Sequence, residues 1–368
     1  STLHAVSRLD RVDRVRARMG ELGVDALLLS LGADLPWLTG YQAMPLERLT
    51  MLVLPADGDA TLVVPRLEAP RVAHDPALFG LRPWEETEDP VAVVAGLVGP
   101  RATLAVSDRA WATFVLRLQA SLPGARWLAA SHVTGPLRAV KDPEEVAALR
   151  RAAAAADRVA AALVGGDIPL VGRSEAQVAD ELSDRLRAEG HDRVNFAIVG
   201  SGPNSASPHH EPGARPIGAG EAVVCDFGGT LDGYCSDTTR TVFTGPPPPE
   251  LRDVYAAVQR AQAAAVAAAV VGTPCEDVDA VARRVIEEAG YGPQFVHRTG
   301  HGIGLEEHED PYLVGGNCQA LVPGHAFSVE PGVYVEGRWG VRIEDVVVAT
   351  EWGPEPLNTV SHDPAVVG

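Results

Sequence analysis

Residues 223–243, which read VVCDFGGTLDGYCSDTTRTVF, decide the fold because they place two acidic side chains on one predicted β-hairpin. Apolar and Thr-rich runs flank a centre rich in Gly and Asp, which is the pattern of strand, turn and strand. A turn about Leu231 and Asp232 would set Asp226 opposite Asp237. Directly opposed side chains lie about 4.5–5.5 Å apart at Cβ, where like charges repel. A cation between the two carboxylates would stabilise such a pair.

A second stretch, residues 327–350, repeats this design with the sequence FSVEPGVYVEGRWGVRIEDVVVAT. A turn near Gly337 would set Glu330 opposite Glu344, so each of two hairpins presents a facing pair of carboxylates. The segment HRTGHGIGLEEHE lies between the hairpins and supplies three histidines, namely His297, His301 and His308. Because four carboxylates and an imidazole suffice to hold two divalent cations, we predict the active site at this place.

The overall composition favours a globular protein of two domains. The chain has 368 residues, and 46% of them are hydrophobic, which allows a substantial core. The formal net charge of −18 argues against non-specific binding to nucleic acid or to an anionic membrane surface. The longest apolar run, residues 261–271, is too short and too rich in Ala to span a bilayer, so we expect a buried helix there.

The four cysteines indicate reduced thiols in a cytoplasmic protein. They include no Cys-x-x-Cys motif and lack the dense spacing of a disulfide scaffold. We expect Cys225 and Cys235, which flank the predicted site, to be small buried residues and not metal ligands. Residues 1–16 contain no apolar stretch of the kind found in signal peptides.

Hydrophobic periodicity predicts an α/β domain over residues 1–138 and a second domain over residues 139–368. The first domain is expected to contain a helix at 9–22, strands at 25–30, 49–55 and 60–65, and further alternation of helix and strand. In the second domain, the expected helices are 141–164, 174–189, 250–271 and 276–288. Their order with the strands occurs twice, about a hundred residues apart. We therefore expect a duplicated α+β domain, each half of which donates one carboxylate hairpin.

The ordered motifs of the chain resemble the proline-specific metallopeptidases of the pita-bread fold, prolidase and Xaa-Pro aminopeptidase. The motifs that carry this resemblance are LTGY, VKDPEEVAALRRA, GPNSASPHHEP, DFGG followed by SDTTRT, HRTGHGIGLEEHEDP, SVEPGVY and GVRIED. The resemblance implies a C-terminal pita-bread domain of the creatinase/aminopeptidase type, a duplicated α+β fold, preceded by a creatinase N-terminal-like α/β domain. It also implies hydrolysis of the Xaa-Pro bond in peptides with proline at the second position.

The same resemblance implies a ligand for each of two metal ions. Asp226 would bind one ion, Asp237 and Glu344 would bridge both, and His301 and Glu330 would complete the second site. Mn²⁺ is the ion that the resemblance indicates first, with Co²⁺ or another divalent ion as the alternative. Such a set of oxygen and imidazole donors favours these ions over a thiolate-type zinc site.

Four further residues are expected to act in catalysis beside Glu330, which would also relay a proton to the prolyl nitrogen. By resemblance, His297 and His308 would stabilise the developing oxyanion, and His209 would close around the substrate. Arg342 lies two positions from Glu344, on the same strand face, and would hold substrate, orient a ligand, or form an ordinary salt bridge. The histidines His132, His210 and His325 carry no such role.

One departure concerns the length of the substrate. Some prolidases carry an Arg shortly after the histidine that corresponds to His308, where it grips the carboxylate of a dipeptide; here Tyr312 stands in that region. The sequence leaves open whether Arg298, Arg338 or Arg342 supplies the cation, and tripeptides of the form Xaa-Pro-Yaa are expected to be accepted as well.

Three alternatives remain at this point: a non-proline aminopeptidase, a creatinase-like C–N hydrolase and a non-enzymatic binding module on the same fold. The resemblance also implies a homodimer in which the first domain helps to wall the neighbouring site. Trp37 would take part in that wall or would be an ordinary core residue.

Overall fold

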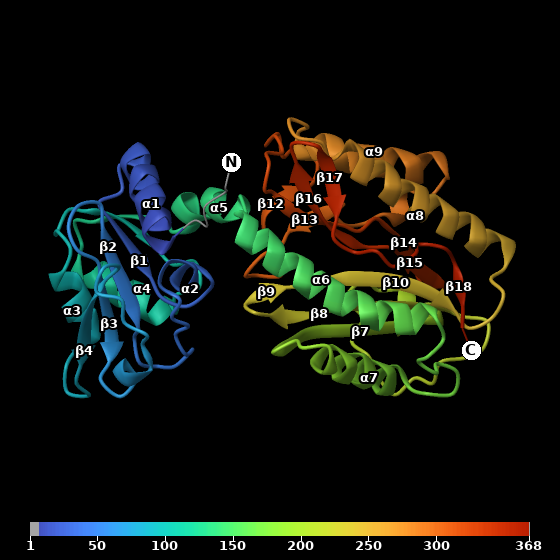
Figure 1. The fold of residues 1–368 in the computed structure, drawn as a ribbon, viewed down its shortest axis with the longest axis horizontal. Helices are drawn as coiled ribbons and strands as arrows, with labels where there is room; N and C mark the ends of the chain where they lie inside the picture. Colours follow the sequence, from blue (N-terminus) through green and yellow to red (C-terminus); the bar gives the residue numbers. More distant parts are fainter. Residues whose placement is uncertain (1–6, 368) are drawn as a thin grey trace. The chain divides into compact units, whose positions relative to one another are not determined.

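In the computed structural model, which describes residues 7–367, the chain divides after Arg138 into two units. The first unit is built on a six-stranded sheet with the order β4-β3-β2-β1-β5-β6 (Figure 1). Its strands are β1 (Ala26–Leu29), β2 (Met51–Pro55), β3 (Thr61–Pro65), β4 (Gly80–Trp84), β5 (Thr103–Val106) and β6 (Arg126–Ala129). Its helices are α1 (Arg8–Leu22), α2 (Asp34–Thr39), α3 (Pro90–Gly96), α4 (Ala112–Ser121) and α5 (Ser131–Ala139), the last of which ends at the boundary.

The elements of the first unit follow local sequence signals, and the predicted α/β character is confirmed. Ser7 and Asp10 form a capping box at the start of α1, and Gly23 ends this helix in the left-handed region with φ 65°. Helices α3 and α4 pack on the sheet through residues such as Val94 and Phe114. Trp37 is only 2% exposed, so it is a core residue and not part of an exposed wall.

Over its described residues, the second unit contains four α-helices and three groups of paired strands. The helices are α6 (Pro143–Val164), α7 (Glu175–Ala188), α8 (Pro249–Ala268) and α9 (Cys275–Glu288). One sheet has the order β18-β10-β8-β7 with β9 paired to β8, and its strands are β7 (Arg193–Ser201), β8 (Ala222–Leu231), β9 (Tyr234–Cys235), β10 (Thr238–Phe243) and β18 (Ala365–Val366). The next has the order β12-β11-β13-β16-β17, with β11 (Gly300–Gly302), β12 (Glu309–Leu313), β13 (Ala326–Val329), β16 (Asp345–Thr350) and β17 (Gly353–Pro356). The third pairs β14 (Gly332–Val335) with β15 (Trp339–Arg342).

The predicted duplication of this unit is confirmed by helices α7 and α9. Residues 171–190 and 271–290 have the same sequence of buried and exposed positions, and each stretch forms one helix after a turn. Helices α6 and α7 pack against β7, β8 and β10, whereas α8 and α9 pack against the strands of the second half, as Figure 1 shows. Each half therefore has a main hydrophobic core behind its acidic hairpin, and a smaller cluster packs Val146 and Leu149 of α6 against Ala326 and Val346 of the other half.

The strand pairing of the first hairpin differs from the predicted register by two residues. Asp226 pairs with Thr239, and not with Asp237, because the turn is centred on Asp232 and Gly233. These two residues have φ 51° and 83°, and a tight two-residue hairpin turn of this kind requires positive φ at both central positions, which Asp-Gly supplies. Asp226 and Asp237 nevertheless line the same cavity.

The second hairpin has the predicted register. Val329 pairs with Asp345 in one sheet and Gly332 pairs with Arg342 in the next. Continuing either ladder sets Glu330 opposite Glu344, at the junction between the two sheets. The turn lies at Gly337, whose φ is 73°. Both hairpins meet there, because Thr239 of the first forms a bridge with Glu344 of the second.

Three further predictions concern buried and apolar segments. Helix α8 ends at Ala268, so the expected buried helix over residues 261–271 is wrong at its end: Val270 and Val271 are 43% and 39% exposed before Gly272 turns the chain at φ 93°. Cys225, Cys235 and Cys275 are buried and Cys318 is exposed, and all four are free thiols. Among residues 7–367 no helix has the length and apolar character needed to cross a bilayer. The prediction for residues 1–16 falls partly on residues 1–6, which lie outside the described residues.

A buried ion pair joins the start of the second unit to the loop that carries His308. Lys141, the only lysine of the chain, places Nζ 2.6 Å from Oε1 of Glu309, and their side chains are 1% and 8% exposed. The pair lies against Gly304, where an added Cβ would come within 2.5 Å of the Glu309 carboxylate. Only glycine fits at this position without displacing the pair.

Replacing Lys141 with Met should destabilise the protein, because Glu309 would keep a buried charge with its cationic partner removed. The expected loss in the free energy of unfolding is about 3–5 kcal/mol, measured by urea denaturation of the metal-loaded protein. The double variant Lys141→Met, Glu309→Gln should recover much of this loss, since it removes both charges. Equal stability of the single variant and the wild type would show that the pair contributes nothing.

Candidate metal centre

Five acidic and imidazole side chains from different strands meet in one cavity of the second unit. Its volume is about 560 Å³. Asp226 lies within β8, Asp237 precedes β10, His301 lies in β11, Glu330 follows β13 and Glu344 precedes β16. All five of the predicted ligands line this cavity, as do the four other residues predicted to act in catalysis, namely His209, His297, His308 and Arg342.

The predicted ligands lie close enough to share metal ions. One ligand atom each of Asp237, His301 and Glu344 falls within 4.8 Å of the others, and all three residues are buried. The Nε2 atom of His301 lies 3.2 Å from Oε1 of Glu330 and 3.5 Å from Oδ2 of Asp237. The Nδ1 atom of His301 donates to its neighbour, the carbonyl oxygen of Gly302, at 3.1 Å, which leaves Nε2 directed at the carboxylates.

Hydroxyl and guanidinium groups orient three of the carboxylates. The Thr239 hydroxyl donates to Oε2 of Glu344 at 2.5 Å, and the Ser328 hydroxyl donates to Oε1 of Glu330 at 2.9 Å. Arg342 donates from Nη2 to Oδ2 of Asp226 at 2.7 Å. Hydrogen bonds of this kind fix the direction of a metal ligand and raise its affinity.

The electrostatics of the cluster favour a bound cation. Burial, and then repulsion by neighbouring carboxylates, raises the pKa of Asp237 and of Glu344 well above the usual range. Burial also raises the pKa of Asp226, although Arg342 opposes it. Burial acts in the same direction on Glu330, but the hydrogen bond and the charge of His301 outweigh it and lower that pKa to about 2.

An unpartnered oxygen of Asp226 also supports the binding of divalent ions by these residues. Oδ1 of Asp226 is buried and has no hydrogen-bond partner, although its companion Oδ2 binds Arg342. A buried charged oxygen without a partner is costly, and a cation in the cavity would satisfy it. Oxygen donors with one imidazole suit Mn²⁺, Co²⁺ or Mg²⁺.

The three histidines predicted for catalysis have different environments in the structure. His308 stacks on the ring of His301 with 3.8 Å between centroids, and burial followed by the charge of His301 lowers the pKa of His308 to about 4. His209 is exposed in the cavity wall. Both ring nitrogens of His297 have partners, the carbonyl oxygen of Arg298 and the hydroxyl of Tyr334. His297 can therefore donate to a substrate only if one of these contacts opens.

Arg342 orients the predicted ligand Asp226 and is not an open clamp for substrate. Its guanidinium is 2% exposed and binds Asp226, Thr239 and the hydroxyl of Tyr334. Sequence reasoning missed Tyr334, whose hydroxyl lies 2.8 Å from both Arg342 and His297. Its place in the motif SVEPGVY was the available signal.

A buried carboxylate that does not itself line the cavity holds the loop that carries His209. Glu175, which is fully buried at the start of α7, accepts hydrogen bonds from the backbone and hydroxyl of Ser201, from Asn204 and from His210 at 2.7–3.1 Å. His210 therefore anchors the loop, in line with its lack of a predicted catalytic role. His325 is buried and accepts from the backbone of Val322.

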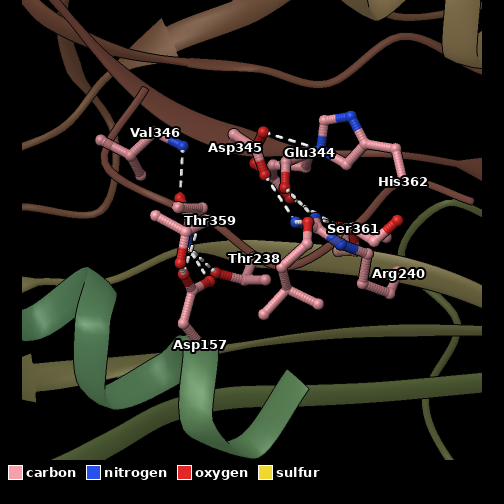
Figure 2. A network of polar contacts seen from close by, with 12 residues as sticks. Asp157, Thr238, Arg240, Glu344, Asp345, Val346, Thr359, Ser361 and His362 are labelled. Carbon is pink, nitrogen blue, oxygen red and sulfur yellow. Dashed lines mark hydrogen bonds and ion pairs between the residues drawn. The ribbon is translucent and has the colours of Figure 1, made fainter. Parts of the chain in front are cut away.

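A polar network behind Glu344 fixes the two hairpins to each other (Figure 2). Arg240 of β10 is 1% exposed and donates to the carbonyl oxygens of Thr239 and Glu344 at 2.9 and 2.7 Å, and to Oδ1 of Asp345 at 2.8 Å. His362 binds the other oxygen of Asp345 at 2.8 Å. Arg240 thus joins the strand of one acidic pair to the strand of the other.

Two protein-family models match the chain, one for each unit. The model described as Metallopeptidase family M24 matches residues 147–351, and the model described as Creatinase/Prolidase N-terminal domain matches residues 11–140. The chain is 46% identical over 363 residues to the probable dipeptidase PepE of Mycobacterium tuberculosis. The aligned region covers 97% of this chain and 96% of that protein.

Solved structures show the same similarity over the whole chain. The dipeptidase PepE of Mycobacterium ulcerans has a TM-score of 0.93 and 46% identity, with 98% of each chain covered. The prolidase of Thermococcus sibiricus has a TM-score of 0.92 and 36% identity, with 98% of this chain and 99% of that chain covered. The similarity therefore includes both units and the strands that carry the acidic pairs.

Without metal, the raised pKa values of Asp237 and Glu344 should make the protein less stable as the pH rises above the ordinary carboxyl pKa of about 4. The raised pKa values of Asp237 and Glu344 mean that the folded state holds protons which the unfolded chain releases near its ordinary carboxyl pKa of about 4. Stability falls with rising pH wherever the folded state binds more protons. Burial lowers the pKa of His301, but the hydrogen bond and charge of Glu330 outweigh burial and raise this pKa. His301 therefore also lowers the stability of the metal-free protein as the pH rises.

The measurement is the Tm of EDTA-treated protein as a function of pH, with Mn²⁺-saturated protein as the control. Mn²⁺ should flatten the fall, because it takes the place of the bound protons. Four histidines whose pKa is lowered, His191, His297, His308 and His325, act in the opposite direction up to the ordinary histidine pKa of about 6.5. A metal-free Tm that rises with pH above this value would contradict the raised pKa values.

Replacing Arg240 with Met should weaken metal binding without removing any predicted ligand. Loss of its contacts to the strands of Thr239 and Glu344 should lower the affinity for Mn²⁺ by about 10–100-fold, measured by titration calorimetry of the metal-free protein. Arg240→Lys keeps the charge but not the forked contacts and should give an intermediate loss. The matched control is Arg187→Met, since Arg187 forms an exposed pair with Asp184. Unchanged affinity in a folded Arg240→Met variant would refute the positioning role.

Proposed function

Because this chain belongs to metallopeptidase family M24, we propose that it hydrolyses the Xaa-Pro bond of dipeptides and short peptides with two divalent metal ions. Membership of the family makes the protein a peptidase, and thus a hydrolase. The proline specificity and the dinuclear centre are the proposal. Its main support is the convergence of four carboxylates and one imidazole in one cavity, with a buried oxygen of Asp226 that no group of residues 7–367 satisfies.

Each predicted ligand has a place in this proposal. Asp226 would bind one ion, Asp237 and Glu344 would bind both, and His301 and Glu330 would complete the second site. Two divalent ions, Mn²⁺ first or Co²⁺ as the alternative, would polarise the scissile carbonyl and lower the pKa of a water molecule.

The residues around the ligands would bind the substrate and move protons. Glu330 lines the cavity beside His301, where its carboxylate can accept a proton and pass it to the prolyl nitrogen. His308, neutral and in the cavity wall, can donate one N–H to the developing oxyanion. His209 would cover the bound peptide, and His297 would assist only after it leaves Tyr334 or Arg298.

Proline at the second position is supported by the apolar part of the wall. Phe196 and Ile198 of β7 line the cavity together with Pro208. Apolar side chains of this kind suit a pyrrolidine ring, and an Xaa-Pro bond has no N–H that would need an acceptor. The solved prolidase to which the chain is similar supports the same choice.

The rival functions predict a different centre or a different substrate. A creatinase-like C–N hydrolase or a binding module of this fold would be expected to lack part of the ligand set, whereas all five residues gather here. A methionine-type aminopeptidase normally lacks the first unit, which matches the creatinase/prolidase N-terminal domain.

A homodimer and a cytoplasmic location complete the proposal. The four free cysteines suit a reducing compartment. The shared-site idea no longer includes Trp37, because this side chain lies in the core of its own unit.

The proposal predicts metal-dependent cleavage of Ala-Pro. EDTA should abolish the activity, and Mn²⁺ or Co²⁺ should restore it. Ala-Pro-Ala should be cleaved with a kcat/KM within about two decades of Ala-Pro, and Met-Ala-Ser should be a poor substrate. Preference for Met-Ala-Ser would overturn the proline-specific function, and full activity of the metal-free protein would overturn the metal-dependent one.

A further inference from the structure

The cavity needs a cation if it is to recognise the free carboxylate of a dipeptide, and the structure distinguishes the three arginines that the sequence left open. Arg342 lines the cavity but is 2% exposed and bound to Asp226. Arg338 does not line the cavity; it pairs with Glu250 at 2.7 Å on the surface. Arg298 is exposed and lies in the cavity wall.

Arg298 is held by an aromatic ring and not by a carboxylate. Its guanidinium carbon lies 4.6 Å from the centroid of the Tyr312 ring, and within residues 7–367 it forms no ion pair. The backbone N–H of Thr299 donates to the carbonyl oxygen of Leu313 at 3.1 Å, which keeps the segment of Arg298 beside strand β12. A guanidinium over a ring is attracted to its face and keeps its N–H edge available for a planar acceptor.

We propose that Arg298, supported by the ring of Tyr312, binds the terminal carboxylate of a dipeptide and so sets the preference for dipeptides over longer peptides. This inference rests on the proposed Xaa-Pro function. Arg298 touches substrate, whereas Tyr312 acts through Arg298 and is a positioning residue. The bidentate geometry of a guanidinium matches a carboxylate, and the contact is lost when the carboxylate becomes an amide or a further peptide bond.

This assignment explains the departure noted in the sequence. Tyr312 stands in the region where some prolidases carry an Arg, so the chain lacks that cation. In its place, Tyr312 provides a surface for an arginine that comes from the neighbouring segment, two residues before β11. The ring, and not the hydroxyl, is the part of Tyr312 that this arrangement uses.

The charges of the wall agree with a zwitterionic ligand. Apart from the predicted ligands and Arg342, the charged residues that line the cavity are Arg298 and Glu307. Their opposite signs match the carboxylate and the ammonium group at the two ends of a free dipeptide. Only Arg298 has the sign that a carboxylate requires.

The test compares Ala-Pro with Ala-prolinamide, which has nearly the same size but no terminal charge. The wild type should prefer Ala-Pro by about 10–100-fold in kcat/KM, since hydrogen bonds to charged groups have this strength. Arg298→Gln should reduce the preference to about onefold through a higher KM for Ala-Pro, with the rate on the amide unchanged. Inhibition by L-proline should weaken in parallel, whereas inhibition by prolinamide should not.

Further variants separate the ring from the hydroxyl and from general damage. Tyr312→Phe should keep the preference, Tyr312→Leu should lose part of it, and Arg298→Lys should retain part. Arg338→Gln is the matched control and should behave as the wild type. Metal content and Tm of each variant establish that the fold and the centre persist.

The outcomes distinguish this inference from the function on which it rests. If the wild type cleaves neither substrate, the Xaa-Pro function fails. If it cleaves both equally well, or if folded Arg298→Gln keeps the full preference, the function stands and the role of Arg298 is refuted. Loss of the preference in Tyr312→Phe would assign the carboxylate to the hydroxyl of Tyr312 instead.

Discussion

The mutual repulsion of four carboxylates in a buried cavity is the constraint on which the rest of this site depends. Asp226, Asp237 and Glu344 are at most 8% exposed, and Glu330 lies beside them at the junction of two sheets. Burying like charges together costs free energy unless cations or donors offset them. Arg342, the hydroxyls of neighbouring residues and the imidazole of His301 offset part of this cost, and divalent ions are suited to offset the rest.

The duplicated architecture explains how so much charge can gather without disrupting the core. Each half keeps most of its apolar residues behind its own hairpin, between two helices and a sheet, and the acids project where the halves meet. The helices also support the site: Glu175 on α7 holds the loop of His209, and Asp279 on α9 accepts from the backbone and hydroxyl of Thr299, two residues before His301. Arg240 then joins the two hairpins from behind.

The cavity wall around this centre combines apolar and charged surfaces with separate tasks. Phe196 and Ile198 offer an apolar surface, whereas Arg298 offers a positive charge beside the ring of Tyr312. Under the proposed function, recognition of a short peptide can change through these residues while the predicted metal ligands stay the same. This separation is consistent with one fold that serves peptidases of different substrate length.

The sequence by itself determined most of the elements and the acidic and imidazole composition of the cavity, because both follow from local patterns. Capping residues such as Asp142 mark helix starts, and the periodicity of the strands places Glu330 opposite Glu344. Only the tertiary structure decided the partners that are far apart in the chain. Lys141 and Glu309 are 168 positions apart, and the choice between Arg298, Arg338 and Arg342 depends on which of them is buried, paired or open to the cavity. The two-residue shift of the first hairpin was also decided by the structure. Alternation along a strand fixes which face of the sheet a side chain takes. The dihedral angles of the turn at Asp232 and Gly233 fix which residue lies opposite it.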